Sequence, residues 1–336
     1  MPSPDSNPAP IAVSVIIPTY NRAHCLPRAL AGLAAMQVPP RLNWEIIVVD
    51  NNSTDSTRAV VESFAASSGL DLTYVFEPQP GSSRARNAGV ARARGGILAF
   101  TDDDARVSPN WLAEIARAFE NPACMGAGGR CVPDWSGVQR PAWLVTQGPD
   151  FVAAGILLDL NLGAEVMPTQ VAPWGLNMAF RRAAFERYGG FRTDLGIFGG
   201  VRLLDEDTEF GKRLIRAGET VLYLPRAVVY HPVQPQRLSK KYFATHFFNE
   251  GGMEVRAAGW PAGTVLVLGI PRYMFRVLAH HGVRALASPR PERRFFHRMQ
   301  MHKGLGAIAE ARRGQAGAPA TALPPRVGQA LKRQGN

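Results

Sequence analysis

The chain has 336 residues, of which 46% are apolar and 19% are charged, as in a globular protein with a buried core. No run of about 18 apolar residues occurs, so we expect no transmembrane helix, and the three cysteines have no metal-ligand spacing and fit a reducing compartment. The net charge of +11 is uneven: residues 230–336 hold 17 Lys and Arg against 4 Asp and Glu, or +13, which leaves −2 for residues 1–229. We therefore expect the C-terminal third to bind an anionic partner, such as a membrane surface or a nucleic acid.

Apolar, β-branched runs alternate with helical patterns through the first 120 residues. They predict strands at 13–17, 45–49, 72–76 and 97–100. The helical patterns between and after them predict helices at 22–36, 53–66, 82–94 and 109–119. Because the strands are apolar on both faces, we expect an α/β fold with a mostly parallel central sheet flanked by helices.

The pattern is less regular after residue 120. Short strands and loops are predicted for 124–180, a helix ended by Gly218 for 205–217, and short strands for 221–224 and 227–230. Basic helices are predicted for 236–313. We expect a disordered lead at 1–10 and a disordered tail at 314–336.

Polar residues follow three of the predicted strands at the point where each ends: "PTYNR" (18–22), "DNNSTD" (50–55) and "TDDDA" (101–105). In open parallel sheets, ligands bind beyond the carboxyl ends of the strands. A single Asp after a strand is as often a turn or cap residue. Three such ends on one edge indicate a ligand site.

The acids Asp102, Asp103 and Asp104 repel one another unless a cation or a donor lies among them. In an extended segment, Asp102 and Asp104 point the same way, which suits Mg²⁺ or Mn²⁺ completed by substrate phosphates. An exposed acidic turn is the alternative. No Gly-rich phosphate loop is present, so arginines must help to neutralise a phosphate, and Arg84 and Arg86 lie in the first turn of a predicted helix near this edge.

Five segments occur in order: "VSVIIPTYNR", "EIIVVDNNSTD", "SRARNAGVARARGGILAFTDDDA", "WGLNMAFRRAAFERYGGF" and "DEDTEFGKRL". Each is weak alone, but together they resemble the inverting family 2 glycosyltransferases. The resemblance implies a GT-A-type nucleotide-sugar-binding fold over 11–235, followed by the basic extension at 236–313. It also implies transfer of a sugar from a nucleotide sugar, most often a UDP-sugar, to a hydroxyl acceptor with Mg²⁺ or Mn²⁺.

The resemblance assigns the nucleotide-binding residues outside the acidic run: Pro18, Thr19, Tyr20, Asp50, Asn51, Arg84 and Arg86. It also implies that Asp102 contacts the ribose and that Asp104 binds the metal. The triple Asp leaves the register open, so Asp102 and Asp103 are further candidates for the metal. His231 is expected to join the metal or the diphosphate.

Inverting transfer needs one carboxylate to take the acceptor's proton. On the predicted helix here, Phe210, Leu214 and Ala217 form a buried stripe that both Glu206 and Asp207 flank, so periodicity does not choose between these acids. The Glu-Asp motif of the family places the base at Asp207. Capping of the helix by both acids is the alternative.

Candidate acceptor contacts are Trp174, Gly175 and Asn177 in "PWGLNMAF". An indole can stack on a sugar face, and an amide can bond to hydroxyls; a Trp packed in the core is the alternative.

Residues 236–313 interleave aromatic and basic side chains, as helices on anionic bilayers do. Helices packed on the catalytic domain with a solvated basic face are the alternative, and without a recognition motif we expect no nucleic acid. We expect a cytoplasmic enzyme, peripheral on the inner membrane if these helices bind it, that acts on a lipid-linked glycan or a cell-envelope polysaccharide precursor. The other classes considered are a sugar nucleotidyltransferase and a non-catalytic membrane or polyanion adaptor on the same fold.

Overall fold

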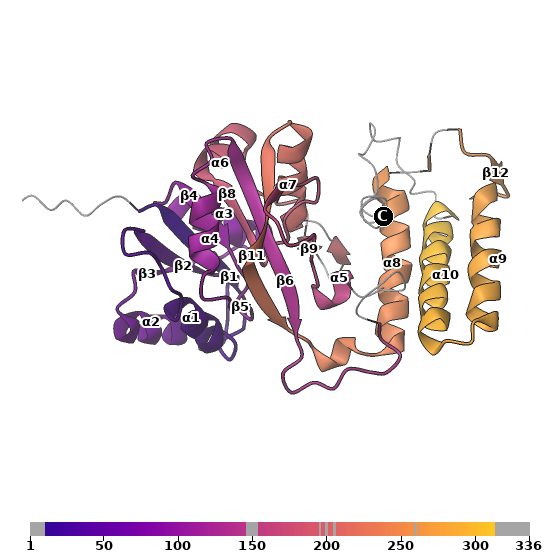
Figure 1. Ribbon diagram of the computed structural model, residues 1–336, viewed down its shortest axis with the longest axis horizontal. Helices are drawn as coiled ribbons and strands as arrows, with labels where there is room; N and C mark the ends of the chain where they lie inside the picture. The colour runs from indigo at the N-terminus through magenta and orange to yellow at the C-terminus, as the bar shows by residue number, and fades with distance from the viewer. Residues whose placement is uncertain are drawn as a thin grey trace, which may run out of the picture. The chain divides into compact units, whose positions relative to one another are not determined.

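The structure is a computed structural model that describes residues 11–145, 154–194, 196–198, 201–203, 206–258, 260–261 and 263–312 (Figure 1). The chain divides into two compact units. The first unit consists of the chain up to Asp134 together with Leu160–Pro232. The second unit consists of Trp135–Asp159 together with the chain from Val233 on. The domain expected over 11–235 is thus interrupted, because its segment 135–159 groups with the C-terminal helices.

Among the described residues of the first unit, nine strands form one sheet in the order β3-β2-β1-β4-β8-β6-β11-β5, with β7 paired to β11. Their bounds are β1 Val13–Thr19, β2 Trp44–Asp50, β3 Leu72–Phe76, β4 Ile97–Phe100, β5 Arg106–Val107, β6 Cys124–Asp134, β7 Met167–Pro168, β8 Met178–Arg181 and β11 Thr220–Pro232. Strands β1 to β4 pair in parallel, as do β6 and β11. Strand β8 runs antiparallel between β4 and β6. The predicted mostly parallel sheet is confirmed.

The helices of the first unit are α1 Leu26–Ala34, α2 Thr57–Ser68, α3 Ser82–Arg92, α4 Trp111–Ala118, α6 Arg182–Tyr188 and α7 Glu206–Arg216. A separate strand pair consists of β9 Gly196–Phe198 and β10 Val201–Leu203. Helix α3 packs against β1 and β2, and α7 against β6 and β11 (Figure 1). The sheet is therefore flanked by helices, as predicted.

Two predicted elements differ in their bounds for reasons of backbone chemistry. The helix expected from residue 22 begins at Leu26, with Pro27 in its first turn, where a missing N–H breaks no helical bond. The two strands expected at 221–224 and 227–230 are one strand, β11, whose pairing with β6 shifts register between Leu224 and Val228. Pro225 lies at that point and has no N–H to give to the ladder.

An aromatic core joins the sheet to α6 and α7. The rings of Phe185 and Phe210 stack with centroids 4.5 Å apart, and Phe180 meets Phe210 edge-on at 4.8 Å. Phe210 and Leu214 are fully buried, as their spacing predicted. Ala217, the third member of the predicted stripe, is exposed because α7 ends before it.

The second unit consists mainly of helices α8 Lys240–Ala258, α9 Arg272–Ala287 and α10 Pro291–Arg312, with short elements α5 Ala154–Leu157, η1 Pro235–Arg237, β12 Leu266–Val267 and β13 Ile270–Pro271. Figure 1 shows α10 between α8 and α9, and it contacts both. The helical character predicted for 236–313 is confirmed for its described residues. None of the described helices has the length and hydropathy needed to cross a membrane.

Helices α8 and α10 pack with their backbones in contact. A Cβ atom at Gly251 would lie 1.9 Å from the carbonyl oxygen of Lys303, and one at Gly306 would lie 1.8 Å from that of Phe248. Glycine is therefore required at both positions. The Lys303 ammonium also donates a 2.8 Å hydrogen bond to Glu250 on α8.

Candidate functional site

The loops that follow β1 and β2 are tied together at the carboxyl edge of the sheet. The Asn21 N–H donates to the Ser53 hydroxyl, and the Asn21 side-chain oxygen accepts from the Thr54 N–H, both at 2.8 Å. Asn21 has a φ of 51°, in the left-handed region that Asn enters more readily than most residues. The two loops therefore form one surface beside the strand ends.

Asp50 ends β2 and is 2% exposed. Its Oδ1 accepts from the Ser53 N–H at 2.8 Å, and its Oδ2 accepts from the Tyr74 hydroxyl at 2.7 Å. Burial, and next this hydrogen bond, raise the pKa of Tyr74. The chain's own donors thus explain why a carboxylate is tolerated here. Each carboxylate oxygen has a second lone pair, so Asp50 can still accept a hydrogen bond from a nucleoside base. That contact stays a prediction.

Asn51 fixes the loop that leads into α3. Its Nδ2 donates to the carbonyls of Glu77 at 3.2 Å and Gln79 at 2.7 Å, and its Oδ1 accepts from the Gly81 N–H at 2.7 Å. Both amide hydrogens are used within the protein. Asn51 therefore positions the start of α3. For its predicted contact with the nucleotide, only the second lone pair of Oδ1 is available.

The two arginines at the start of α3 lie in different surroundings. Arg86 is 6% exposed, and its guanidinium lies 6.0 Å from the centre of the Phe191 ring. Arg84 is only half-buried. Arg84 is therefore the more accessible of the two for a ligand phosphate, and Arg86 packs against the aromatic core.

The acids after β4 form a turn, in which the Ala105 N–H donates to the Asp102 carbonyl at 3.2 Å. The extended segment expected here is therefore wrong, and the two-residue alternation from which Asp102 and Asp104 were predicted to point the same way does not apply. Asp103 is 7% exposed and accepts a 2.7 Å hydrogen bond from the Thr19 hydroxyl. Since Thr19 ends β1, this bond joins two neighbouring strand ends.

Asp104 has a basic side chain beside each carboxylate oxygen. Arg22 donates to Oδ2, and His231 Nε2 lies 3.4 Å from Oδ1. The same Arg22 nitrogen lies 3.8 Å from Asp103. Arg22 follows β1 and His231 belongs to β11. The fold thus gathers groups from three separate parts of the chain around two carboxylates.

The electrostatics of this cluster favour a cation. Burial raises the pKa of Asp103 to about 6; the Thr19 hydrogen bond opposes this rise, and the charge of Asp104 adds to it. Burial would lower the pKa of Arg22, but the charges of Asp103 and Asp104 outweigh it and raise that pKa above its usual value. The Arg22 guanidinium supplies the positive charge that the two acids require.

The donor atoms also suit a hard divalent ion, since a carboxylate oxygen of Asp104 and the His231 nitrogen lie 3.4 Å apart. Within the described ranges, no three His, Cys, Asp or Glu side chains gather into a group able to hold a metal ion. Mg²⁺ is commonly held by one or two protein ligands together with substrate phosphates and water. An ion at this position would compete with Arg22 for the two acids.

Known proteins share both the sequence pattern and the fold. The family model "Glycosyl transferase family 2" matches residues 14–189. The chain belongs to glycosyl transferase family 2. The succinoglycan biosynthesis protein ExoM of Rhizobium meliloti is 33% identical over 243 residues, which cover 71% of this chain and 72% of that protein. The validoxylamine A glucosyltransferase of Streptomyces hygroscopicus subsp. jinggangensis is 34% identical over 227 residues, 60% of this chain and 51% of its own.

A solved structure shows the same fold as this family 2 glycosyltransferase. The mannosyltransferase PcManGT from Pyrobaculum calidifontis, in complex with GDP-Man and Mn²⁺, aligns over 90% of this chain and 89% of its own. Its TM-score is 0.57 at 22% sequence identity. The expectations of a GT-A fold and of a glycosyltransferase are confirmed.

Asn177 is a core residue of this glycosyltransferase. It is 1% exposed; its Oδ1 accepts from the Trp111 indole at 2.9 Å, and its Nδ2 donates to the carbonyls of Arg130 at 2.9 Å and Ala227 at 2.8 Å. The predicted contact of Asn177 with acceptor hydroxyls is wrong, because these bonds hold α4, β6 and β11 together. The amide has no exposed face to offer a ligand.

The other acceptor and base candidates stay predictions. Trp174 is half-buried and Gly175 is buried. Glu206 and Asp207 open α7, but their side chains lie outside the described residues. What the structure does establish is that Phe210 anchors this helix in the core, so the start of α7 is held relative to the sheet.

At the end of β1, Pro18 is half-buried and Tyr20 is 57% exposed, so the Tyr20 ring is accessible to a nucleoside base. Arg22, two residues later, was missed by sequence reasoning. The sequence does show this arginine within "PTYNR", directly after a predicted strand. Its partner Asp104, however, lies 82 residues further along the chain. Only the adjacent strand ends bring the two together.

Proposed function

We propose that this enzyme transfers a sugar from a nucleoside diphosphate sugar to a hydroxyl acceptor with inversion, and that it depends on Mg²⁺ or Mn²⁺. The observation that carries the proposal is the grouping of Arg22, Asp103, Asp104 and His231 at the ends of β1, β4 and β11. It supplies oxygen and nitrogen donors at the edge where parallel sheets bind ligands. Family membership and the GDP-Man and Mn²⁺ in the PcManGT structure support this interpretation.

On the donor side, the exposed Tyr20 ring would lie against the base, and Arg84 would contact the nucleotide. Asp102 would hold the ribose. Asp104 and His231 would hold the metal ion, while the buried Asp103, bonded to Thr19, keeps the turn in place. When bound, the ion would stabilise the charge of the departing diphosphate.

On the acceptor side, Asp207 would take the proton of the attacking hydroxyl. Its position in the first turn of α7 lets the backbone N–H groups of that turn stabilise the carboxylate. Trp174 would contact the acceptor. No general acid is required, because the leaving group departs as a diphosphate whose charge is already stabilised.

Replacement of Asp207 by Asn tests the base. It should lower kcat by ~10²–10⁴ while donor affinity changes little. Glu206→Gln is the matched control, since both positions open the same helix. Full turnover in Asp207→Asn with a loss in Glu206→Gln would move the base to Glu206.

Replacement of Asp104 by Asn tests the metal site. Calorimetry with Mn²⁺ should show that nucleoside diphosphate binding is lost, because the variant lacks the charge that faces the ion. Asp71→Asn, a change on an exposed side chain bonded to Arg94, should bind normally. Donor hydrolysis should also stop with EDTA, and unchanged affinity in Asp104→Asn would rule out the metal role.

We propose uridine as the nucleoside of the sugar donor. In thermal-shift assays with Mn²⁺, UDP should raise the melting temperature more than GDP or ADP at equal concentration. A larger stabilisation by another nucleoside diphosphate would reassign the donor.

We further propose that the acceptor is a lipid-linked glycan or cell-envelope polysaccharide precursor and that the enzyme meets it on an anionic membrane. ExoM is named for succinoglycan biosynthesis, which supports a polysaccharide precursor. The β12–β13 hairpin exposes four successive apolar side chains, Val265, Leu266, Val267 and Leu268, at 64%, 51%, 45% and 88%. Leu268 also has a φ of 52°, at the tip of this hairpin.

Helix α9 also exposes apolar side chains, and it adds positive charge. Phe275, Val283 and Leu286 are exposed at 45%, 64% and 82%. Arg276 and Arg284 are exposed on the same helix, whose 16 residues include no acid. Apolar side chains among cations suit the interface of an anionic bilayer.

Vesicle sedimentation tests this surface. The protein should bind vesicles that contain phosphatidylglycerol more tightly than pure phosphatidylcholine vesicles. Leu268→Ser and the double variant Arg276→Gln/Arg284→Gln should each reduce that binding. Equal binding of the wild type to both vesicle types would exclude the anionic membrane as a partner.

A further inference from the structure

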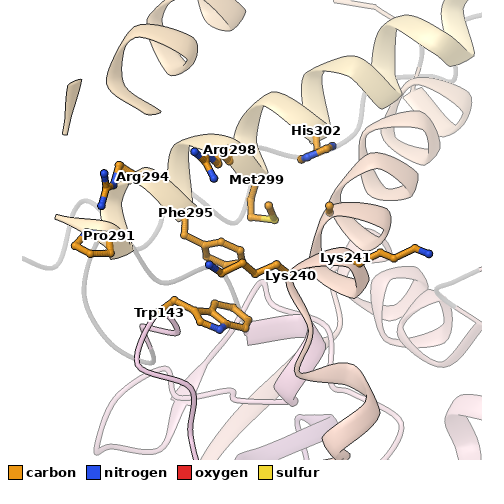
Figure 2. Close-up of a pocket in the computed structure, with 10 residues that line it drawn as sticks. Trp143, Lys240, Lys241, Pro291, Arg294, Phe295, Arg298, Met299 and His302 are labelled. Atoms are coloured by element: carbon orange, nitrogen blue, oxygen red, sulfur yellow. The ribbon is translucent and has the colours of Figure 1, made fainter. Parts of the chain in front are cut away.

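A pocket of about 550 Å³ opens in the second unit between α8, α10 and the segment that contains Trp143. Figure 2 shows Phe295 of α10 gathered with Lys240 of α8 and Trp143, while Arg294 and Arg298 project from α10. This volume lies in the range of small-molecule sites. The residues that line the pocket all belong to the second unit.

The rim of the pocket is cationic. Lys240, Lys241, Arg294 and Arg298 line it and are exposed. Among the described residues, none of these four side chains has a carboxylate partner, and no acid lines the pocket. Arg294 and Arg298 are four residues apart on one helix, a spacing at which like charges destabilise the helix. An anion between them would attract both guanidinium groups and so offset this repulsion.

Two helix ends add to the positive potential. Lys240 and Lys241 are the first residues of α8, and Pro291 is the first residue of α10; all three line the pocket. The opening N–H groups of a helix lack intrahelical partners and form the positive end of its dipole. Glu292, in the first turn of α10, does not line the pocket. Phosphate is the anion that such ends commonly bind.

The inner wall is apolar. Phe295 and Met299 are 5% and 3% exposed, and the Trp143 ring centroid lies 4.5 Å from that of Phe295. Lys240 places its ammonium 5.8 Å from the centre of the Trp143 ring. The pocket therefore joins a cationic rim to an aromatic wall, which suits a ligand with a phosphate next to a hydrocarbon chain.

We propose that this pocket binds the phosphate headgroup of an anionic lipid. The phosphate accepts hydrogen bonds from Arg294, Arg298 and Lys240, and the first carbons of the lipid chain lie against Trp143 and Phe295. This proposal does not depend on the proposed sugar transfer. A membrane phospholipid and a polyprenyl phosphate carrier both present this chemistry, and the experiment below distinguishes them.

The test is calorimetry on the full chain with two soluble probes, farnesyl phosphate and dihexanoyl phosphatidylglycerol, each below its critical micelle concentration. EDTA is present so that a metal-dependent donor site does not contribute. The double variant Arg294→Gln/Arg298→Gln should weaken probe binding at least about tenfold, because two charge-assisted hydrogen bonds are lost. The matched control Arg41→Gln/Arg92→Gln removes the same charge from exposed positions of the first unit and should change it less than about twofold.

Tighter binding of farnesyl phosphate would assign the pocket to a polyprenyl carrier, and tighter binding of the phosphatidylglycerol to a bilayer phospholipid; either supports the proposal. Binding of neither probe would overturn it. Equal losses in the two double variants would also overturn it, since they indicate only general attraction to a basic surface. So would inorganic phosphate that binds as tightly as farnesyl phosphate.

Trp143→Ala gives a second test that leaves every cation in place. It should weaken farnesyl phosphate and leave inorganic phosphate unchanged, and unchanged farnesyl phosphate affinity would refute the role of the aromatic wall. Donor hydrolysis with Mn²⁺, measured on the same samples without EDTA, reports on the proposed transferase. Its failure would count against that function and not against the lipid pocket.

Discussion

Replacement of Asn177 by Ala should destabilise the first unit strongly, because three partners, two of them in buried hydrogen bonds, lose those bonds at once. These are the indole N–H of Trp111 and the carbonyl oxygens of Arg130 and Ala227. The Ala227 carbonyl lies where the register of β11 shifts, and the Asn177 amide donates to it at that point.

The magnitude follows from these partners. A buried polar group left without a partner costs about 1–3 kcal/mol. Two such groups and the partly buried Arg130 carbonyl give about 3–6 kcal/mol in total. For a unit of about 200 residues, each kcal/mol lowers the melting temperature by roughly 2–4 °C. We therefore expect Asn177→Ala to melt about 6–24 °C below the wild type.

The assay is thermal unfolding followed by circular dichroism, with acceptor KM measured at a temperature where both proteins are folded. Asn249→Ala, on an exposed face of α8, is the control and should shift the melting temperature by less than about 2 °C. If Asn177→Ala melts like the wild type but shows a raised acceptor KM, Asn177 binds the acceptor and the structural argument is wrong.

Two further predictions concern the second unit. Gly306→Leu should prevent α8 and α10 from packing, because even a Cβ there would lie 1.8 Å from the Phe248 carbonyl oxygen; retained helix packing and an unchanged melting temperature would contradict this. Burial, and next the charge of His297, lower the pKa of His281, so the unfolded chain binds this proton more readily than the folded one. Its contribution to stability is present above about pH 6.5 and is lost as pH falls through the folded pKa. Melting temperatures measured from pH 8 to pH 5 should fall less in His281→Gln than in the wild type.

Local patterns were enough to predict most of the sheet and its helices. The strands at 72–76 and 97–100 were predicted with their observed bounds, because each is an apolar run bounded by polar residues. The predicted buried stripe of α7 failed only at Ala217, which lies one residue past the helix end. Helix and strand ends depend on which backbone groups find partners, and those partners often come from distant segments.

The candidate site was predictable as a place on the sheet but not as a set of contacts. Polar residues after β1, β2 and β4 were enough to locate the ligand edge, since parallel strands end at one edge. The partners were not visible: Arg22 reaches Asp104, and Thr19 reaches Asp103, 82 and 84 residues apart. For Asn177 the error is the opposite one. Its amide was predicted to bind the acceptor, but it forms hydrogen bonds within the core instead.

The sequence by itself determined the alternation of strands and helices, the family and the basic C-terminal third. These follow from local propensity, motif order and charge, all of which can be read along the chain. Only the tertiary structure decided that the acids after β4 form a turn around Arg22 and His231, and that α8 and α10 enclose a cationic pocket with Trp143. The reason is that charge pairing and burial depend on distances in space, and for residues far apart in the chain those distances are set by strand order and helix packing.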